Sequence, residues 1–318
     1  MTGDSRPNTP AEPKPCEYVI QADHLGKQYG RAQALSDFTM RVPRGSIYGF
    51  VGRNGAGKTT LIRLICGLQK PTSGSFTLCG IPHDSAENAT ARRRMGAMVE
   101  APAIRMDMTA GENLKQQFLI LGVPSFDGID ALLKLTGLEN TGRKKARQFS
   151  LGMKQRLGIA IALAGNPDLL MLDEPVNGLD TQGIVELRAL LLKLNRERGT
   201  TILISSHNLD ELSRLATHYG IIDHGHMVRE LSAAELDAAC RKSVRLEVSD
   251  AAALGRALDA MGIEYKVVSG TTADVFAKVN VTALALALAK AHCEILSMQE
   301  KDESLENYFI SLVGDGHD

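Results

Sequence analysis

The chain has 318 residues, of which 44% are hydrophobic and 23% are charged, and its formal net charge is −1 at pH 7. This composition is typical of a globular protein with one large domain or two ordinary ones, and the charge gives no basic footprint for nucleic acid. The five cysteines are scattered and show no C-x-x-C spacing, which argues against a disulfide framework or a zinc site and favours a reducing compartment. No apolar run is long enough to span a bilayer, and the first residues lack the apolar core of a signal peptide.

The first segment, residues 1–17, carries four prolines among mostly polar residues. Such a segment can bury little apolar surface, so we predict a disordered tail. A strand is expected to begin at Tyr18, and a second one covers residues 35–42. The globular part of the chain is therefore expected to begin at residue 18.

A glycine-rich loop lies between the apolar strand Ile47–Val51 and a segment with helical apolar spacing from residue 61. It fits the pattern G-x-x-x-x-G-K-[ST] of a phosphate-binding loop, in which backbone N–H groups and a helix N-terminus surround a phosphate. We expect Lys58 to reach the β- and γ-phosphates and the Thr59 hydroxyl to ligate Mg²⁺. The predicted nucleotide-binding residues of this loop are Gly52, Arg53, Asn54, Gly55, Ala56, Gly57, Lys58, Thr59 and Thr60.

The middle of the chain, about residues 100–165, is predicted to form a helical insertion. Helical periodicity runs from Met108 to about residue 138, with breaks at residues 122–124 and around Gly128. Ser150 is a good N-cap for a further helix that reaches Gly165. We expect such an insertion between core strands to contact another protein.

Two acidic residues follow the apolar segment Leu169–Leu172, which resembles a central parallel strand buried on both faces. The strand end would place Asp173 beside the phosphate loop, where its carboxylate can hold Mg²⁺ through water. Glu174 is positioned to take a proton from an attacking water. The alternative is a surface acidic pair before a turn.

Helical and strand patterns alternate up to about residue 230, which predicts a parallel α/β sheet. The later segment, 241–318, shows the order β-α-β-β-α-β of a small ferredoxin-like sandwich, in which the middle two strands end at residue 279 and the last strand covers residues 294–296. A final helix is expected from residue 304 to 312. We therefore predict an α/β domain at 18–230 and a small α+β domain at 241–318.

The order and spacing of motifs in residues 18–230 resemble the ATPase subunit of ABC transporters. The resemblance implies a P-loop NTPase cassette with a helical insertion subdomain, and it implies that ATP and Mg²⁺ are bound. The motifs are Walker A at 52–60, the signature (usually LSGGQ) at 150–155, Walker B at 169–174, the D-loop at 177–180 and the switch histidine segment at 205–207.

The resemblance also implies roles for single residues. Ser150, Gly152 and Met153 would meet the nucleotide of a second subunit, and Asp180 would hydrogen-bond across the dimer. Tyr29 would stack on adenine, and His207 would contact the γ-phosphate and position water. From the residues alone, Asp180 can equally cap the next helix, Tyr29 can be an ordinary aromatic, and His207 can be a satisfied histidine at a strand end.

Two positions depart from the family pattern. Glu100 stands where the family usually has glutamine, and its carboxylate is predicted to meet Mg²⁺ or a water bound to it. In the signature, Leu151 replaces a glycine. Both departures resemble the branch that exports bacitracin-type peptides, lantibiotics and other antibiotics, often for self-protection.

The resemblance implies an ATPase subunit that powers export of an antibiotic, peptide or drug. We expect it to be cytoplasmic and peripheral on the inner face of the cell membrane, with a separately encoded permease and a second copy as partners, and no nucleic acid. One alternative is a soluble ABC-type ATPase that acts on the ribosome or DNA, but the single uninterrupted cassette without a basic face disfavours it. The other is a small-molecule kinase, which would need neither the signature nor His207.

Overall fold

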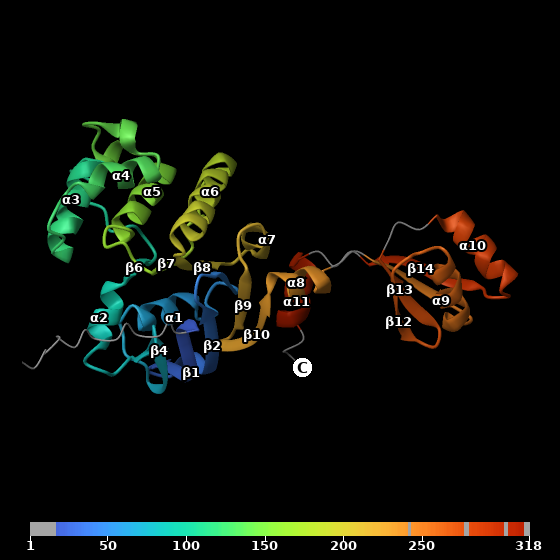
Figure 1. The fold of residues 1–318 in the computed structure, drawn as a ribbon. Coiled ribbons are helices and arrows are strands. Elements are labelled where there is room, and N and C mark those ends of the chain that lie inside the picture. Colours follow the sequence, from blue (N-terminus) through green and yellow to red (C-terminus); the bar gives the residue numbers. More distant parts are fainter. Residues whose placement is uncertain (1–16, 241–242, 277–279, 302–304, 315–318) are drawn as a thin grey trace, which may run out of the picture. The chain divides into compact units, whose positions relative to one another are not determined.

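The computed structural model describes residues 17–240, 243–276, 280–301 and 305–314, so the tail predicted at 1–17 falls outside the described residues except for Glu17. The chain divides into two compact units, one ending at Glu230 and the other beginning at Leu231 (Figure 1). None of the helices in these described ranges is both long and apolar enough to cross a bilayer.

The first unit is built on a six-stranded sheet with the strand order β10-β9-β3-β8-β7-β6. β3 pairs in parallel with β8 and β9, and β7 pairs in parallel with β6 and β8, which confirms the predicted parallel α/β sheet. Every residue of β3, β7 and β8 is buried, as expected for strands covered on both faces. The strands are β3 (Ile47–Val51), β6 (Met95–Met98), β7 (Leu169–Leu172), β8 (Thr201–Ser206), β9 (His218–Asp223) and β10 (His226–Ser232).

A second, antiparallel sheet has the order β2-β1-β4-β5. It consists of β1 (Tyr18–Tyr29), β2 (Ala32–Pro43), β4 (Ser73–Leu78) and β5 (Ile81–Pro82). Its Phe38 meets Phe50 of β3 edge to face at a centroid distance of 5.9 Å, so the two sheets share one hydrophobic core. The sequence predicted strands here but not that they form a separate sheet. The alternation of apolar and polar residues along one strand does not show which strand it pairs with.

The predicted helical insertion contains three α-helices that gather in one part of the unit (Figure 1). They have a small core of their own, which includes Leu138, Phe149 and Leu157. The expected break near residue 122 is present, since Gly122 caps the C-terminus of α3 with a left-handed φ of 69°. The helices of this unit are α1 (Lys58–Ile65), α2 (Asn88–Arg93), α3 (Ala110–Leu121), α4 (Gly128–Leu135), α5 (Leu151–Ala162), α6 (Thr181–Arg198) and α7 (Leu209–Ser213), with 3₁₀ turns η1 (Glu139–Thr141) and η2 (Ala146–Gln148).

The second unit has a four-stranded sheet with the order β12-β13-β11-β14 and antiparallel pairing throughout. Together with the helices, this is the β-α-β-β-α-β arrangement predicted from the sequence. Residues 277–279 and 304, included in the predicted strand and final helix, lie outside the described residues. The elements are α8 (Ala233–Ala239), β11 (Ser243–Val248), α9 (Ala251–Ala260), β12 (Tyr265–Ser269), β13 (Thr272–Val275), α10 (Val281–Lys290), β14 (Ile295–Lys301) and α11 (Leu305–Gly314).

Candidate nucleotide-binding site

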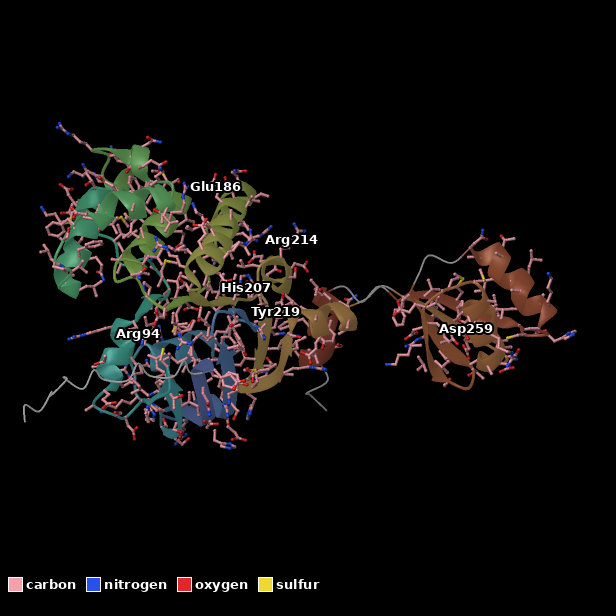
Figure 2. The ribbon with its side chains drawn as sticks, in the orientation of Figure 1. Arg94, Glu186, His207, Arg214, Tyr219 and Asp259 are labelled. Carbon is pink, nitrogen blue, oxygen red and sulfur yellow. The ribbon has the colours of Figure 1, made fainter. Side chains whose placement is uncertain are left out.

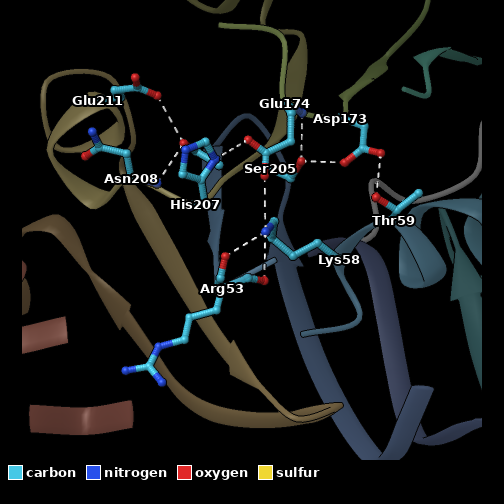
Figure 3. Close-up of polar contacts among 11 residues, drawn as sticks. Arg53, Lys58, Thr59, Asp173, Glu174, Ser205, His207, Asn208 and Glu211 are labelled. Carbon is cyan, nitrogen blue, oxygen red and sulfur yellow. Dashed lines mark hydrogen bonds and ion pairs between the residues drawn. The ribbon is translucent and has the colours of Figure 1, made fainter. Parts of the chain in front are cut away.

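Three neighbouring strands of the parallel sheet end at one edge, and each is followed by predicted site residues. β3 leads into the phosphate loop, β7 into Asp173 and Glu174, and β8 into His207. Because β8 lies between β3 and β7, these segments meet at the carboxyl edge of the sheet. The side chains are shown together in Figure 3.

The phosphate loop has a backbone that only glycine allows at several positions. Gly55 and Gly57 have φ of 84° and 113°, a region that side chains rarely permit. A Cβ at Gly57 would lie 2.7 Å from the carbonyl oxygen of Ala34, and one at Gly52 would lie 2.5 Å from that of Ile222. Right- and left-handed residues in succession form a backbone concavity that suits an anion, so the loop fits a phosphate group.

Lys58 is the first residue of α1 and its side chain is buried. Its Nζ donates hydrogen bonds to the carbonyl oxygens of Gly52 (2.6 Å) and Arg53 (3.2 Å). The same Nζ forms an ion pair with Oε1 of Glu174 at 3.1 Å. The loop thus holds a compact positive charge next to the acidic end of β7.

A chain of hydrogen bonds fixes Asp173, whose exposed fraction is 1%. Thr59 Oγ1 donates to Asp173 Oδ2 at 2.8 Å, and Ser205 Oγ donates to Asp173 Oδ1 at 2.7 Å. Ser205 Oγ also accepts from the backbone N–H of Glu174 at 2.9 Å. No motif in the sequence indicates this role for Ser205, which lies opposite Asp173 because Leu172 and Ile204 pair in register.

The Thr59 and Asp173 oxygens fit a magnesium ion. A hydroxyl and a carboxylate in direct contact are hard oxygen donors, and Mg²⁺ is usually held by one or two such protein groups together with water and phosphate oxygens. The residues present would therefore hold this ion beside the phosphate loop.

Glu174 joins the phosphate loop to the switch histidine. Its Oε2 lies 2.8 Å from Nδ1 of His207. Its Oε1 is buried and accepts no hydrogen bond from any residue in the described part of the chain, although Lys58 Nζ is within ion-pair distance. This oxygen thus keeps lone pairs that can accept a proton.

The segment that carries His207 is held by its neighbours. Ser206 Oγ donates to Glu211 Oε2 at 3.1 Å and accepts from the N–H of Asn208 at 3.0 Å (Figure 3). The ring of His207 is consequently presented from a fixed turn between β8 and α7.

The side chains of Ser150 in the signature and Asp180 in the D-loop make local hydrogen bonds, whereas the N–H of the D-loop residue Asn177 donates to the carbonyl oxygen of Glu174 at 3.1 Å. Ser150 Oγ accepts from the N–H of Met153 at 3.3 Å, and Asp180 Oδ1 accepts from the N–H of Gly183 at 2.9 Å. Both are N-cap bonds within α5 and α6. A Cβ placed on Gly152 would lie 3.6 Å from a methyl carbon of Leu179, so the two segments approach each other.

Tyr29 and Glu100 have partners that the sequence reasoning did not identify. Tyr29, which is 40% exposed, donates its hydroxyl hydrogen to Gln69 Oε1, and the Nζ of Lys27 lies 5.0 Å from its ring centroid. The Glu100 carboxylate forms an ion pair with Arg63 of α1. The carboxylate predicted to meet Mg²⁺ therefore has a protein cation beside it, which no motif in the sequence indicates.

Comparison with known proteins decides the family. The ABC transporter family matches residues 35–177. The bacitracin transport ATP-binding protein BcrA of Enterococcus faecalis is 39% identical over 303 residues, which cover 94% of this chain and 98% of the relative. The chain belongs to the ATP-binding proteins of ABC transporters. As a member of this family it binds ATP and hydrolyses it, as predicted.

A second relative of this ABC ATP-binding protein is the lantibiotic transport ATP-binding protein SrtF of Streptococcus pyogenes. It is 41% identical over 212 residues, which cover 67% of this chain and 90% of SrtF. The match to BcrA covers 94% of the chain and hence includes most of both units.

Solved structures confirm the predicted cassette fold. cbiO1 from Clostridium perfringens, part of the ABC transporter complex cbiONQ, superposes with a TM-score of 0.63 and 28% identity, covering 70% of this chain and 91% of cbiO1. The dimeric cassette MJ0796 bound to ADP and Pi, in a post-hydrolysis state, gives a TM-score of 0.61 and 26% identity, covering 67% of this chain and 98% of that one.

Proposed function

We propose that this ABC ATPase powers the export of a peptide antibiotic or similar drug through a separately encoded membrane permease. It would bind the permease from the cytoplasmic face of the membrane. The observation that carries the catalytic part is Glu174, half-buried between Lys58 and His207 with one carboxylate oxygen that accepts no hydrogen bond within the described ranges. The names of its relatives, which refer to bacitracin and lantibiotic transport, support the cargo class.

The residues of the site would divide the chemistry among them. The phosphate loop would hold the β- and γ-phosphates through its backbone N–H groups, with Lys58 adding a positive charge. Thr59 and Asp173 would hold a magnesium ion, which neutralises charge on the phosphates when bound. Glu174 would take the proton of the attacking water, and His207 would orient Glu174 through the contact at Oε2.

A second copy of the chain would complete the site. Ser150 is the N-cap of α5 and Gly152 lies in its first turn, where helix N–H groups suit a phosphate. Within one chain the Ser150 hydroxyl accepts a hydrogen bond from Met153 of the same turn. Two chains arranged head to tail would bring this end of α5 over the phosphate loop of the partner. The dimer of MJ0796 is a precedent for paired cassettes.

The substitution Glu174→Gln tests the catalytic assignment. Glutamine keeps the shape but cannot accept the proton, so phosphate release should fall by about 100-fold or more while MgATP binding is retained. ATP should then trap a dimer, measured by sedimentation velocity with and without MgATP. Lys58→Ala is the matched control, because it should weaken ATP binding itself. If the Glu174→Gln chain hydrolysed ATP at the rate of the unsubstituted chain, Glu174 would not be the general base.

Export is tested in cells that carry the gene. Replacing the native copy with the Glu174→Gln variant should raise sensitivity to the exported peptide antibiotic, with bacitracin as the first compound to test. Affinity purification of this ATP-trapped variant from detergent-solubilised membranes should recover an integral membrane permease. Recovery of ribosomal RNA or DNA in place of a membrane protein would contradict the proposal.

A further inference from the structure

The ion pair between Arg63 and Glu100 connects the helix of the phosphate loop to the loop after β6. Arg63 lies in α1, and Glu100 follows β6 by two residues. The side chains of Arg63 and Glu100 are 33% and 58% exposed, so the contact lies at the rim of the site. Glu100 also has a left-handed φ of 61°, a conformation uncommon for a residue with a side chain.

Helix geometry places Arg63 one turn from Thr59, a residue expected to hold magnesium. Thr59 and Arg63 are four residues apart in α1, so their side chains lie on the same face, one turn from each other. Thr59 contacts Asp173, and Arg63 contacts Glu100. The backbones of Thr59 and Arg63 are thus about one helical turn, ~5 Å along the axis, apart, and Arg63 joins this helix to the Glu100 carboxylate.

Sheet geometry brings a third acidic group to the same edge. β6 and β7 pair in parallel with Met98 opposite Leu172, and the N–H of Asp173 donates to the carbonyl of Met98 at 2.9 Å. Glu100, two residues after β6, therefore follows the same edge of the sheet as Asp173 and Glu174, which follow β7. A third carboxylate here opposes the binding of a polyanionic nucleotide unless a cation compensates it.

We propose that Arg63 is a positioning residue for Glu100: it neutralises the carboxylate and holds it against α1, the helix that carries Thr59, so that a site with glutamate at this position still accepts MgATP. Glu100 then serves as the partner of Arg63 and not as a ligand of the magnesium ion. This inference rests on the proposed nucleotide site. It adds a residue, Arg63, that lies outside all the recognised motifs.

The test is a double-substitution cycle on nucleotide affinity in the full-length chain. We expect Arg63→Met to weaken MgATP binding by about tenfold, since Glu100 is then uncompensated, a size usual for coupled charged neighbours. Glu100→Gln should stay within about twofold of the unsubstituted chain, and the double variant R63M/E100Q should recover most of the lost affinity. Affinities are measured by calorimetric titration, with magnesium and with EDTA.

Arg94 and Asp168 provide a matched control pair. They also form an ion pair, and they flank the opposite ends of the same two strands, β6 and β7. Figure 2 shows Arg94 beside α2, well separated from His207. Arg94→Met, Asp168→Asn and their combination should leave MgATP affinity unchanged.

Two results would overturn the pairing. One is additive or absent effects of R63M and E100Q; the other is loss of the magnesium dependence of ATP binding in E100Q, which would make Glu100 a metal ligand. If R63M fails to fold, Arg63→Lys keeps the charge and must bind MgATP within about threefold of the unsubstituted chain. Failure of the unsubstituted chain to bind MgATP would instead refute the proposed nucleotide site.

Discussion

Glu174 has a left-handed backbone φ of 48°, a conformation that residues other than glycine rarely adopt. Its N–H donates to Ser205 Oγ, and both carboxylate oxygens face basic side chains, so its surroundings impose this conformation. Such strain costs about 1–3 kcal/mol and tends to persist where a side chain must be aimed at a functional site. We infer that the strained backbone of Glu174 is retained because it directs the carboxylate toward Lys58 and His207.

Cys66, directly after α1, has a thiol that the surrounding protein shields from water. Burial raises the pKa of this thiol to about 12, partly offset by the positive charge of Arg92. An unfolded thiol ionises near pH 8.5, so above that pH the unfolded chain loses a proton that the folded chain keeps. The stabilisation is complete below the unfolded pKa and is lost as the pH rises toward 12.

We therefore expect the free energy of unfolding to fall more steeply between about pH 9 and 11 in the native chain than in a Cys66→Ala variant. Urea unfolding at a series of pH values measures the slope of the free energy of unfolding against pH for both chains. Comparing these slopes removes any loss of stability in the variant that does not depend on pH. Iodoacetamide labelling at pH 8 should also leave Cys66 unmodified. Parallel slopes, or rapid alkylation of Cys66, would show that its thiol is accessible.

The residues that sequence reasoning found and missed differ in one respect. Lys58, Asp173, Glu174 and His207 belong to motifs at strand ends, and parallel strands bring such ends together, so their proximity followed from the pattern. Ser205 and Arg63 act through contacts between segments far apart in the sequence. Such pairings depend on register and rotamer, which a single sequence does not contain.

At the scale of elements, the start of α3 shows how a local signal defines a helix. Thr109 Oγ1 accepts from the N–H of Glu112 at 3.2 Å, and Glu112 Oε2 accepts from the N–H of Thr109 at 2.7 Å. This capping box satisfies two N–H groups that the helix leaves unpaired. The hydrogen bond from the backbone of Thr109, and then that from Lys145, lowers the pKa of Glu112.

Thr109→Ala should lower the free energy of unfolding of the first unit by about 1 kcal/mol, because the N-terminal N–H groups of α3 lose their acceptor. Urea unfolding followed by circular dichroism measures this change. Thr109→Ser, which keeps the hydroxyl, is the control and should lose much less. Equal losses in the two variants would show that the methyl group, and not the capping hydrogen bond, stabilises this turn.

The elements themselves were more predictable than their assembly. Apolar periodicity and glycine breaks predicted α3, α4 and the strands of the parallel sheet, since these signals are local. The partition of β1, β2, β4 and β5 into a separate sheet was not predicted, because it depends on contacts such as that of Phe38 with Phe50. Short helices such as α7 and α8 were missed for a similar reason: one or two turns carry too little periodicity.

At the scale of the whole molecule, the two units have separate hydrophobic cores. The core of the first surrounds buried residues such as Phe50 and Leu61, and that of the second surrounds Leu246 and Leu254. All the residues proposed to handle the nucleotide lie in the first unit. We therefore expect that a change in the core of the second unit leaves the phosphate loop intact.

Leu254→Ala should lower the free energy of unfolding of the second unit by about 2–5 kcal/mol, because it removes a fully buried side chain and leaves a cavity. A ligand raises the stability only of the unit that binds it, by about 2.7 kcal/mol at a hundredfold excess over Kd. Scanning calorimetry should accordingly show a lowered transition for the second unit and an unchanged MgATP-induced shift of the first. The matched control is Leu61→Ala, equally buried in α1, which should lower the nucleotide-sensitive transition instead. If Leu254→Ala abolished the MgATP shift, the second unit would have to be part of the nucleotide-binding machinery, and the division of labour between the two cores would be wrong.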